Sequence, residues 1–546
     1  MAKTIHFSDD ARLTMFAGME KVANTVMKTI GPKGRNVVFS KGYGAPQITN
    51  DGVTIAKEIE LEDKLENMGA ELIKEAASKT NDAAGDGTTT ATLLTYAMVK
   101  EWLREIRSGI NAIDLKNGMK KAGTIVVDAL AKMSKPLNTQ EEIEQVATIS
   151  AQDEEVGKII ADAMEKVGKD GVITVEDGRT FGLEIEVTDG MKFDNGYISP
   201  YMISHPEKME ARINDASILI TDKKISTLKD ILPVLEQLAG TGKRELVIIA
   251  DDIDGEALTG IVLNRLKGTL TILGVKAPGF GDRKKEMLRD LAILTGATVI
   301  TEETGYKLET AGLDHLGHAN AVVSTKDATT IIGGAGDKHL IQSRVGELRR
   351  QIELTKSNYD KEKLIERVAK LAGGIGVIRV GAASEVEMKE KKLRIEDALN
   401  ATKAAVEEGI VAGGGVALLK AANALEKLKL KNRDEEVWAG IVARALSYPV
   451  RQIAENAGKE WAVIANEVRA HADMTYWYDA AADEYKDLVK AGIIDPKKVS
   501  RCALENSISI AGMFLTTEAV IAELPKKEEP EHAHGGGGMG WMGGMY

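Results

Sequence analysis

Residues 81–92 read Asn81-Asp82-Ala83-Ala84-Gly85-Asp86-Gly87-Thr88-Thr89-Thr90-Ala91-Thr92, and this stretch decides how the chain is interpreted. Apolar residues recur at helical spacing on both sides of it, over 68–76 and again over 94–106. The stretch therefore predicts a glycine turn that delivers three threonines to the N-terminus of a second helix. The N–H groups of a first helical turn lack partners and the helix dipole attracts negative charge, so the pattern indicates an anion site, most simply for phosphate.

Asp86 lies next to the predicted phosphate site. A carboxylate beside a phosphate is repulsive unless a divalent cation separates them, so the loop is typical of a site for phosphate plus metal. An ordinary glycine turn with a threonine cap explains the bare motif equally well, and the loop alone does not decide between the two.

Length and composition narrow the protein class. At 546 residues the chain exceeds one core, and 43% hydrophobic and 28% charged residues are typical of a globular protein with about three domains. No run of 18 apolar residues predicts a membrane span, and the N-terminal residues show neither a signal peptide nor a transit peptide. A single cysteine, Cys502, suits a reducing cytoplasm. The net charge of −12 and 4% aromatic residues argue against nucleic acid as a partner.

Helix and turn signals organise the N-terminal part of the chain. Ser8 is predicted to cap a helix that ends at Gly31-Pro32. An extended segment at 46–49 meets Asn50-Asp51-Gly52, which predicts a tight turn into a second extended segment at 53–55. Standing alone, Asp51 would be interpreted as a turn residue only.

The middle of the chain has a different hydrophobic pattern. Between Gly190 and about Gly373, short apolar runs alternate with helical stretches, which predicts an α/β domain. Its helices are more apolar than a core requires, and as a group they indicate an exposed binding patch, although each residue taken singly fits a core position. Further on, Gly413-Gly414-Gly415 interrupts a helical pattern and so predicts close backbone approach to another group. Asp495 is suited to capping or to a turn.

Several common catalytic classes lack their motifs. No G-x-x-x-x-G-K-[ST] or kinase signature is present, the eight histidines show no metal-ligand spacing, and Cys502 has no nearby histidine. The local patterns by themselves name no activity.

The chain nevertheless closely resembles the group I chaperonins, the ring-forming ATPases of the GroEL type. The resemblance covers essentially the whole chain. It rests on the strings Thr29-Ile30-Gly31-Pro32-Lys33-Gly34-Arg35-Asn36-Val37, Asp86-Gly87-Thr88-Thr89-Thr90, Lys276-Ala277-Pro278-Gly279-Phe280-Gly281-Asp282-Arg283, Glu396-Asp397-Ala398-Leu399 and Val411-Ala412-Gly413-Gly414-Gly415, and on a Gly/Met-rich tail.

This resemblance implies a multidomain α and α/β ring-forming chaperonin fold. A mainly helical equatorial ATP-binding domain would comprise 1–133 and 409–524, and a small intermediate domain would comprise 134–189 and 374–408. An α/β apical domain would be inserted at 190–373, and 525–546 would form a disordered tail. Pro136, Gly190, Gly374 and Gly409 match the family's hinges.

The resemblance also implies a nucleotide site with ATP, Mg²⁺ and K⁺ as cofactors. Asp397 would position or activate the attacking water, Asp51 would lie near the metal and the water, and Asp86 would hold the metal. The remaining nucleotide contacts would come from Thr29, Ile30, Gly31, Pro32, Asn50, Gly87, Thr88, Thr89, Thr90, Gly414, Asp479, Ala480, Ala481, Ile493 and Asp495. Asn50 and Asp479 depart from the lysine and asparagine that are frequent at these positions in the family.

The implied activity is ATP hydrolysis coupled to protein folding. Non-native polypeptides would bind apical hydrophobic side chains, namely Tyr197, Tyr201, Met202, Leu232, Leu235, Leu258, Val262 and Leu263. The implied partners are further copies of the chain in seven-membered rings stacked back to back, a lid-like co-chaperonin of the GroES type, and unfolded protein, with no nucleic acid and no membrane.

Two other functions remain open at the level of sequence. One is a non-hydrolysing ring scaffold or cell-surface binder that kept the fold, against which the retention of Asp51, Asp86 and Asp397 argues. The other is a small-molecule phosphotransferase, against which the apolar apical helices argue, because such an enzyme would need a closed pocket with convergent polar groups.

Overall fold

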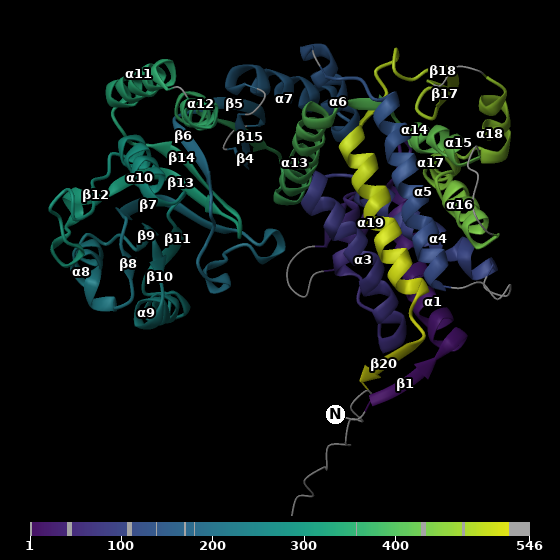
Figure 1. The fold of residues 1–546 in the computed structure, drawn as a ribbon, viewed down its shortest axis with the longest axis horizontal. Coiled ribbons are helices and arrows are strands. Elements are labelled where there is room, and N and C mark those ends of the chain that lie inside the picture. Colours follow the sequence, from purple (N-terminus) through teal and green to yellow (C-terminus); the bar gives the residue numbers. More distant parts are fainter. Residues whose placement is uncertain are drawn as a thin grey trace, which may run out of the picture.

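The structure is a computed structural model that describes residues 3–40, 46–105, 112–137, 139–168, 171–178, 181–355, 357–426, 433–471 and 475–523. Three large apolar cores organise it, and Figure 1 shows the corresponding lobes from right to left. The predicted tail, 525–546, lies outside the described residues. None of the helices within the described ranges combines the length and apolarity that a membrane span requires.

The first lobe is mainly helical. Its helices are α1 (Ser8–Val26), α2 (Gly52–Glu58), α3 (Lys64–Ala84), α4 (Thr88–Glu105), α5 (Ala112–Met133), α14 (Val416–Ala421), α15 (Asn423–Glu426), α16 (Arg433–Ala445), α17 (Tyr448–Asn456), α18 (Trp461–Ala470) and α19 (Lys497–Leu515). Its strands pair as β1 (Lys3–Phe7) with β20 (Ala519–Glu523), β2 (Val37–Phe39) with β3 (Gln47–Thr49), β16 (Ile410–Ala412) with β19 (Ile494–Pro496), and β17 (Tyr476–Asp479) with β18 (Glu484–Asp487).

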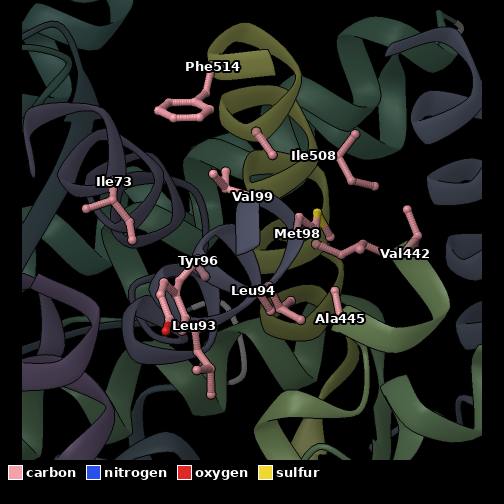
Figure 2. Close-up of a cluster of buried hydrophobic side chains, with 14 of the residues drawn as sticks. Ile73, Leu93, Leu94, Tyr96, Met98, Val99, Val442, Ala445, Ile508 and Phe514 are labelled. Carbon is pink, nitrogen blue, oxygen red and sulfur yellow. The ribbon is translucent and has the colours of Figure 1, made fainter. Parts of the chain in front are cut away.

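Helices α4 and α19 form the centre of this lobe. Figure 2 shows side chains from α3, α4, α16 and α19 directed into one interior, including Ile73, Met98, Val442 and Phe514. All of these residues are fully or almost fully buried. The two ends of the chain therefore build one core together, because α4 lies before the central insert and α19 lies after it.

The second lobe is small and lies between the other two. It contains the three-stranded sheet β4–β15–β5 (Val172–Asp177, Ile375–Gly381, Gly182–Thr188) and the helices α6 (Gln140–Ala151), α7 (Glu154–Val167) and α13 (Glu385–Glu408). Helix α13 packs against both α6 and α19, and it therefore belongs to the boundary with the first lobe (Figure 1).

The third lobe is an α/β unit. Its sheet runs β11–β9–β7–β13–β14–β6 (Thr271–Lys276, Glu245–Ala250, Ala211–Thr221, Gly317–Ser324, Ala328–Gly334, Gly190–Asp194), with β12 (Val299–Ile300) also paired to β7. Strands β8 (Lys224–Ile225) and β10 (Asp252–Ile253) form a separate pair. The helices are α8 (Leu232–Gly240), α9 (Gly255–Leu266), α10 (Gly281–Thr295), α11 (Lys338–Leu354) and α12 (Asn358–Ala372). The alternation of strands and helices predicted for this part of the chain is confirmed. The functional names of the predicted domains stay predictions.

The predicted hinge residues lie where the chain passes between lobes. Lys135 and Ile410 exchange two backbone hydrogen bonds beside Pro136. A Cβ on Gly409, whose φ is +83°, would lie 2.4 Å from the Lys135 carbonyl oxygen. At the other passage, Gly374 has a φ of +64° and a Cβ on it would lie 2.9 Å from the Thr188 carbonyl oxygen, while a Cβ on Gly190 would lie 2.6 Å from Cδ1 of Ile375. The backbone therefore crosses at close range in both places.

Three local predictions were wrong. Asn50-Asp51-Gly52 does not turn into a strand, because Asp51 caps the N-terminus of α2. Ser8 is not the cap of α1: it is the first helical residue, and its hydroxyl donates to Glu518 at 2.6 Å. The three glycines do not interrupt a helix, because they form the turn between β16 and α14. Ser8 thus bonds to a residue near the other end of the chain, whereas Asp51 and the glycines each lead into the helix that follows them.

Helices α1 and α3 pack closely because each carries a glycine where they meet. This close packing predicts that a larger residue there lowers the stability of the fold. A Cβ on Gly18 would lie 1.8 Å from the Glu66 carbonyl oxygen, so Gly18→Ala forces the helices apart. We expect a loss of about 2 kcal/mol of stability, seen as a lower midpoint in thermal unfolding followed by circular dichroism. Gly346→Ala, a helical glycine with open space around its Cβ position, is the matched control and should stabilise by about 0.5 kcal/mol. Equal midpoints for the two variants would contradict the close-packing account.

Candidate functional site

A cavity of about 720 Å³ lies where the first and second lobes meet. All of the residues predicted to contact nucleotide or metal line it: Thr29, Ile30, Gly31, Pro32, Asn50, Asp51, Asp86, Gly87, Thr88, Thr89, Thr90, Asp397, Gly414, Asp479, Ala480, Ala481, Ile493 and Asp495. They come from segments more than 400 residues apart in the sequence. The structure thus brings the whole predicted set around one space, while its ligand stays a prediction.

The threonine stretch forms one wall as the sequence predicted. Helix α3 ends at Gly85, which has left-handed backbone angles, and α4 begins at Thr88. Gly87 has a φ of +81°, and a Cβ there would lie 2.5 Å from Cγ1 of Val499. The loop is therefore tight. The first turn of α4 carries backbone N–H groups that have no partner within the helix, and groups of this kind bind phosphate oxygens.

Asp51 stands opposite this helix start. Its carboxylate accepts hydrogen bonds from the backbone N–H groups of Val53 at 3.2 Å and Thr54 at 2.9 Å. The next residue, Gly52, packs so tightly against the threonines that a Cβ would lie 2.4 Å from Oγ1 of Thr89. Asp51 is therefore held by its own helix. It lines the cavity, and its predicted role at the metal and the water stays a prediction.

Asp86 and Asp397 face the cavity from opposite lobes. Burial raises the pKa of Asp86, and the charge of Asp51 adds to this effect. Burial also raises the pKa of Asp397 well above its ordinary value, with further contributions from the charges of Asp51 and Asp86. Asp86 and Asp397 therefore both lie within the field of neighbouring carboxylates.

Asp495 is the fourth aspartate of this group. It lies in β19, where its carboxylate accepts hydrogen bonds from the backbone N–H groups of Gly414 and Gly415. Burial, aided by the charge of Asp86, nevertheless raises the pKa of Asp495 to about 7. The prediction that Asp495 serves in a cap or turn is replaced by a role in fixing the glycine turn against the cavity.

Part of the cavity lining is apolar, and the β17–β18 hairpin contributes to it. Pro449, Val450, Ile453, Leu488 and Ile493 line it. Asp479 ends β17; its carboxylate pairs with Lys486 at 2.6 Å and accepts hydrogen bonds from the backbone N–H groups of Ala481 and Ala482. Burial opposes ionisation of Asp479, but these partners together hold its pKa below the ordinary value. The Asp479 carboxylate therefore finds its ion-pair and hydrogen-bond partners within the β17–β18 hairpin and the turn between its strands.

Sequence reasoning missed some lining residues. The Ser150 hydroxyl donates to Asp86 at 3.3 Å. Arg394 is the one basic side chain among the described residues lining the cavity, against acidic side chains at Asp51, Asp86, Asp153, Glu154, Asp397, Asp479 and Asp495. Its position three residues before Asp397 on a helix was a usable signal, since residues at that spacing share a face.

The donor set fits a metal bound together with phosphate. Within the described ranges, no three His, Cys, Asp or Glu side chains are grouped closely enough to hold a metal ion by themselves. Mg²⁺ commonly takes only one or two protein carboxylates and completes its shell with phosphate oxygens and water. Asp86, beside the predicted phosphate site, suits that mode of binding.

The predicted polypeptide-binding residues do not form one exposed surface. Tyr201 is 70% exposed, Leu263 50% and Leu232 40%, whereas Leu258 and Val262 are half-buried. Tyr197, Met202 and Leu235 are buried in the core of the third lobe, so their predicted placement on an exposed patch was wrong. The Met202 thioether accepts the Gly274 N–H at 3.2 Å, which explains its inward position. Leu266, 70% exposed on α9 beside Leu263, was missed.

Comparison with known families gives one match. The family model described as the TCP-1/cpn60 chaperonin family matches residues 22–525, which is nearly the whole chain. The match covers all six aspartates that line the cavity within the described residues.

The raised pKa of Asp495 generates a pH prediction. A group whose pKa rises to about 7 on folding contributes stability at low pH, and this contribution is lost as the pH rises from about 4 to 7. Asp495→Asn keeps a neutral acceptor, so its thermal midpoint without ligand should match that of the parent at about pH 4 and exceed it by a few degrees at pH 8. A constant difference across this pH range would contradict the burial of an ionisable Asp495.

Proposed function

The chain belongs to the TCP-1/cpn60 chaperonin family, and on that basis we propose that it is an ATP-dependent chaperonin that captures and folds non-native polypeptides. Membership supports a chaperone role in protein folding, and ATPase activity is known in the family. The observation that carries the ATP-dependent part is the convergence of Asp51, Asp86 and Asp397 with the Thr88–Thr90 helix start around one cavity.

In this proposal the phosphates lie against the first turn of α4. The backbone N–H groups of that turn and the threonine hydroxyls donate hydrogen bonds to phosphate oxygens, so positioning requires no basic side chain from the loop. Mg²⁺, held by Asp86, would neutralise phosphate charge, and K⁺ would be a further cation at the site. The apolar part of the cavity lining, which includes Ile453 and Ile493, suits the adenosine.

Asp397 is the proposed acceptor of the proton from the attacking water. Burial and neighbouring carboxylates raise its pKa, so its ionised form is a stronger base than an exposed aspartate. Asp51 is held on α2 by two backbone N–H groups and would orient the same water. Catalysis by this set consists of alignment and proton acceptance, which is what phosphoryl transfer to water requires.

Assembly into rings is part of the proposal. The strand pairs β1–β20 and β2–β3 are isolated two-stranded ribbons in the described structure. Each leaves directly paired apolar side chains exposed, Ile5 with Ile521 and Val38 with Ile48. Such ribbons are only marginally stable alone and have open edges, so contact with a second copy of the chain would stabilise them. Seven-membered rings, stacked in pairs, follow from the group I resemblance.

Polypeptide capture is proposed for exposed residues of the third lobe. Tyr201, Leu232, Leu263 and Leu266 present apolar surface to solvent, which is suited to the apolar segments of unfolded chains. A lid-like co-chaperonin of the GroES type would bind the same side chains. The single cysteine, Cys502, supports placing the protein in the cytoplasm.

The hydrolytic role of Asp397 can be tested by substitution. Asp397→Asn removes the proton acceptor while keeping the size of the side chain. We expect kcat for ATP hydrolysis to fall about a hundredfold or more, with nucleotide affinity within about threefold of the parent. Phosphate release and fluorescent-nucleotide titration measure the two quantities. Turnover equal to that of the parent would remove Asp397 from the mechanism.

The capture surface can be tested with an exposed and a buried leucine. Leu263→Glu places a charge on exposed apolar surface, so binding of a denatured model protein should weaken at least about tenfold while the thermal midpoint and ATPase rate stay unchanged. Leu235→Glu buries a charge and should instead lower the thermal midpoint of the third lobe. Undiminished capture by Leu263→Glu would show that polypeptides bind elsewhere.

A further inference from the structure

Helix α13 meets the phosphate-side loop at one glycine. Gly85 ends α3 with φ +69° and ψ 3°, and its N–H donates to the Asn81 carbonyl oxygen at 2.7 Å. A Cβ on Gly85 would lie 2.3 Å from Cβ of Asn400, 2.6 Å from its Cγ and 2.8 Å from its Nδ2. These distances are well below van der Waals contact, so the side chain of Asn400 occupies the space that any other residue at position 85 would need.

The two residues of this contact are linked to the two central carboxylates of the site. Gly85 directly precedes Asp86 in the loop, and Asn400 lies three residues after Asp397 on α13, which places both on neighbouring positions of one helix face. Asp86 and Asp397 line the same cavity. The Gly85–Asn400 contact therefore lies directly behind the pair of groups whose separation matters for hydrolysis.

Ion pairs hold α13 on both sides of this contact, and Ala404 of α13 lies in one buried cluster with Ala84, which precedes Gly85. Near its C-terminus, Glu407 pairs with Lys498 at 2.5 Å and Glu408 pairs with Arg501 at 2.5 Å, both on α19. Beside Asp397, Glu396 pairs with Lys208 of the third lobe at 2.6 Å. These ion pairs join long, partly exposed side chains, which adapt to small shifts. The contact between Gly85 and Cβ of Asn400 joins backbone to the base of a side chain and cannot adapt in that way.

We propose that Gly85 and Asn400 form a steric stop that sets how closely Asp397 approaches the phosphate loop, and that both are positioning residues for the hydrolysis proposed above. The inference rests on that proposed function. Glycine at position 85 is then required for two separable reasons: its left-handed backbone, and the absence of a side chain facing α13.

Substitution at position 85 separates these reasons. In Gly85→Ala the new methyl group displaces α13 by on the order of 1 Å, and a misplacement of that size can cost about a hundredfold in rate. We expect kcat to fall on the order of a hundredfold while the dissociation constant for nucleotide changes less than about threefold. In Gly85→Ala/Asn400→Gly the opposing Cβ is removed, so most of the lost kcat should return, measured against Asn400→Gly alone.

Gly296→Ala is the matched control. Gly296 also ends a helix with left-handed angles, φ +75° and ψ 15°, and its N–H likewise donates to the carbonyl four residues before it, Ala292. The nearest atom to a Cβ there, the Ala335 carbonyl oxygen, would lie at an ordinary 3.5 Å. This variant carries the same backbone strain without the clash, so it should lose some thermal stability and keep kcat.

Hydrogen exchange of α13 provides a readout that does not depend on hydrolysis. Residues 395–402 should exchange faster in Gly85→Ala and return towards the parent rate in the double variant. Full kcat in Gly85→Ala, no recovery in the double variant, or nucleotide affinity lost in parallel with kcat would each overturn the proposal. A parent protein that hydrolyses no ATP would defeat the proposed function alone, and the exchange experiment would still decide whether the stop exists.

Discussion

The burial of several carboxylates around one cavity is the constraint on which the rest of the site depends. Asp86, Asp397 and Asp495 all have raised pKa values because they are buried and lie near other negative charges. Arg394 is the one basic side chain on the described lining. Such a cavity is electrostatically costly without a ligand and favours a bound cation. Because the carboxylates come from two lobes, a shift of α13 changes the distances between them and therefore changes this electrostatic cost.

The fold serves this arrangement by joining distant parts of the chain. The N-terminal helices and α19 share one core, while α13 reaches the same cavity from the middle lobe. The third lobe is connected to α13 through the chain passages at Gly190 and Gly374 and through the Lys208–Glu396 ion pair. A change in the orientation of the third lobe therefore has a physical route to the helix that carries Asp397.

Local sequence patterns predicted some of this and failed elsewhere for identifiable reasons. The turn at Gly85–Gly87 and the helix starting at Thr88 followed from residue type and spacing, because glycine conformation and helix periodicity are local properties. Asp51 was assigned to a hairpin because Asn-Asp-Gly suits a tight turn, whereas its carboxylate caps α2. The sequence predicts surface positions for Tyr197, Met202 and Leu235, whereas the structure packs all three side chains in the core of the third lobe. The approach of Asp397 to Asp86, more than 300 positions away, came only from resemblance to a family.

The most direct test of this account is a structure of the full-length protein with Mg²⁺, ADP and aluminium fluoride, which mimics the phosphoryl group in transfer. The account predicts the fluoride group at the first turn of α4, with the Asp397 carboxylate in contact with the attacking water and Asn400 seated against Gly85. Nucleotide bound outside this cavity, or bound within it while α13 lies away from the loop, would contradict the central claim that one site is completed by two lobes.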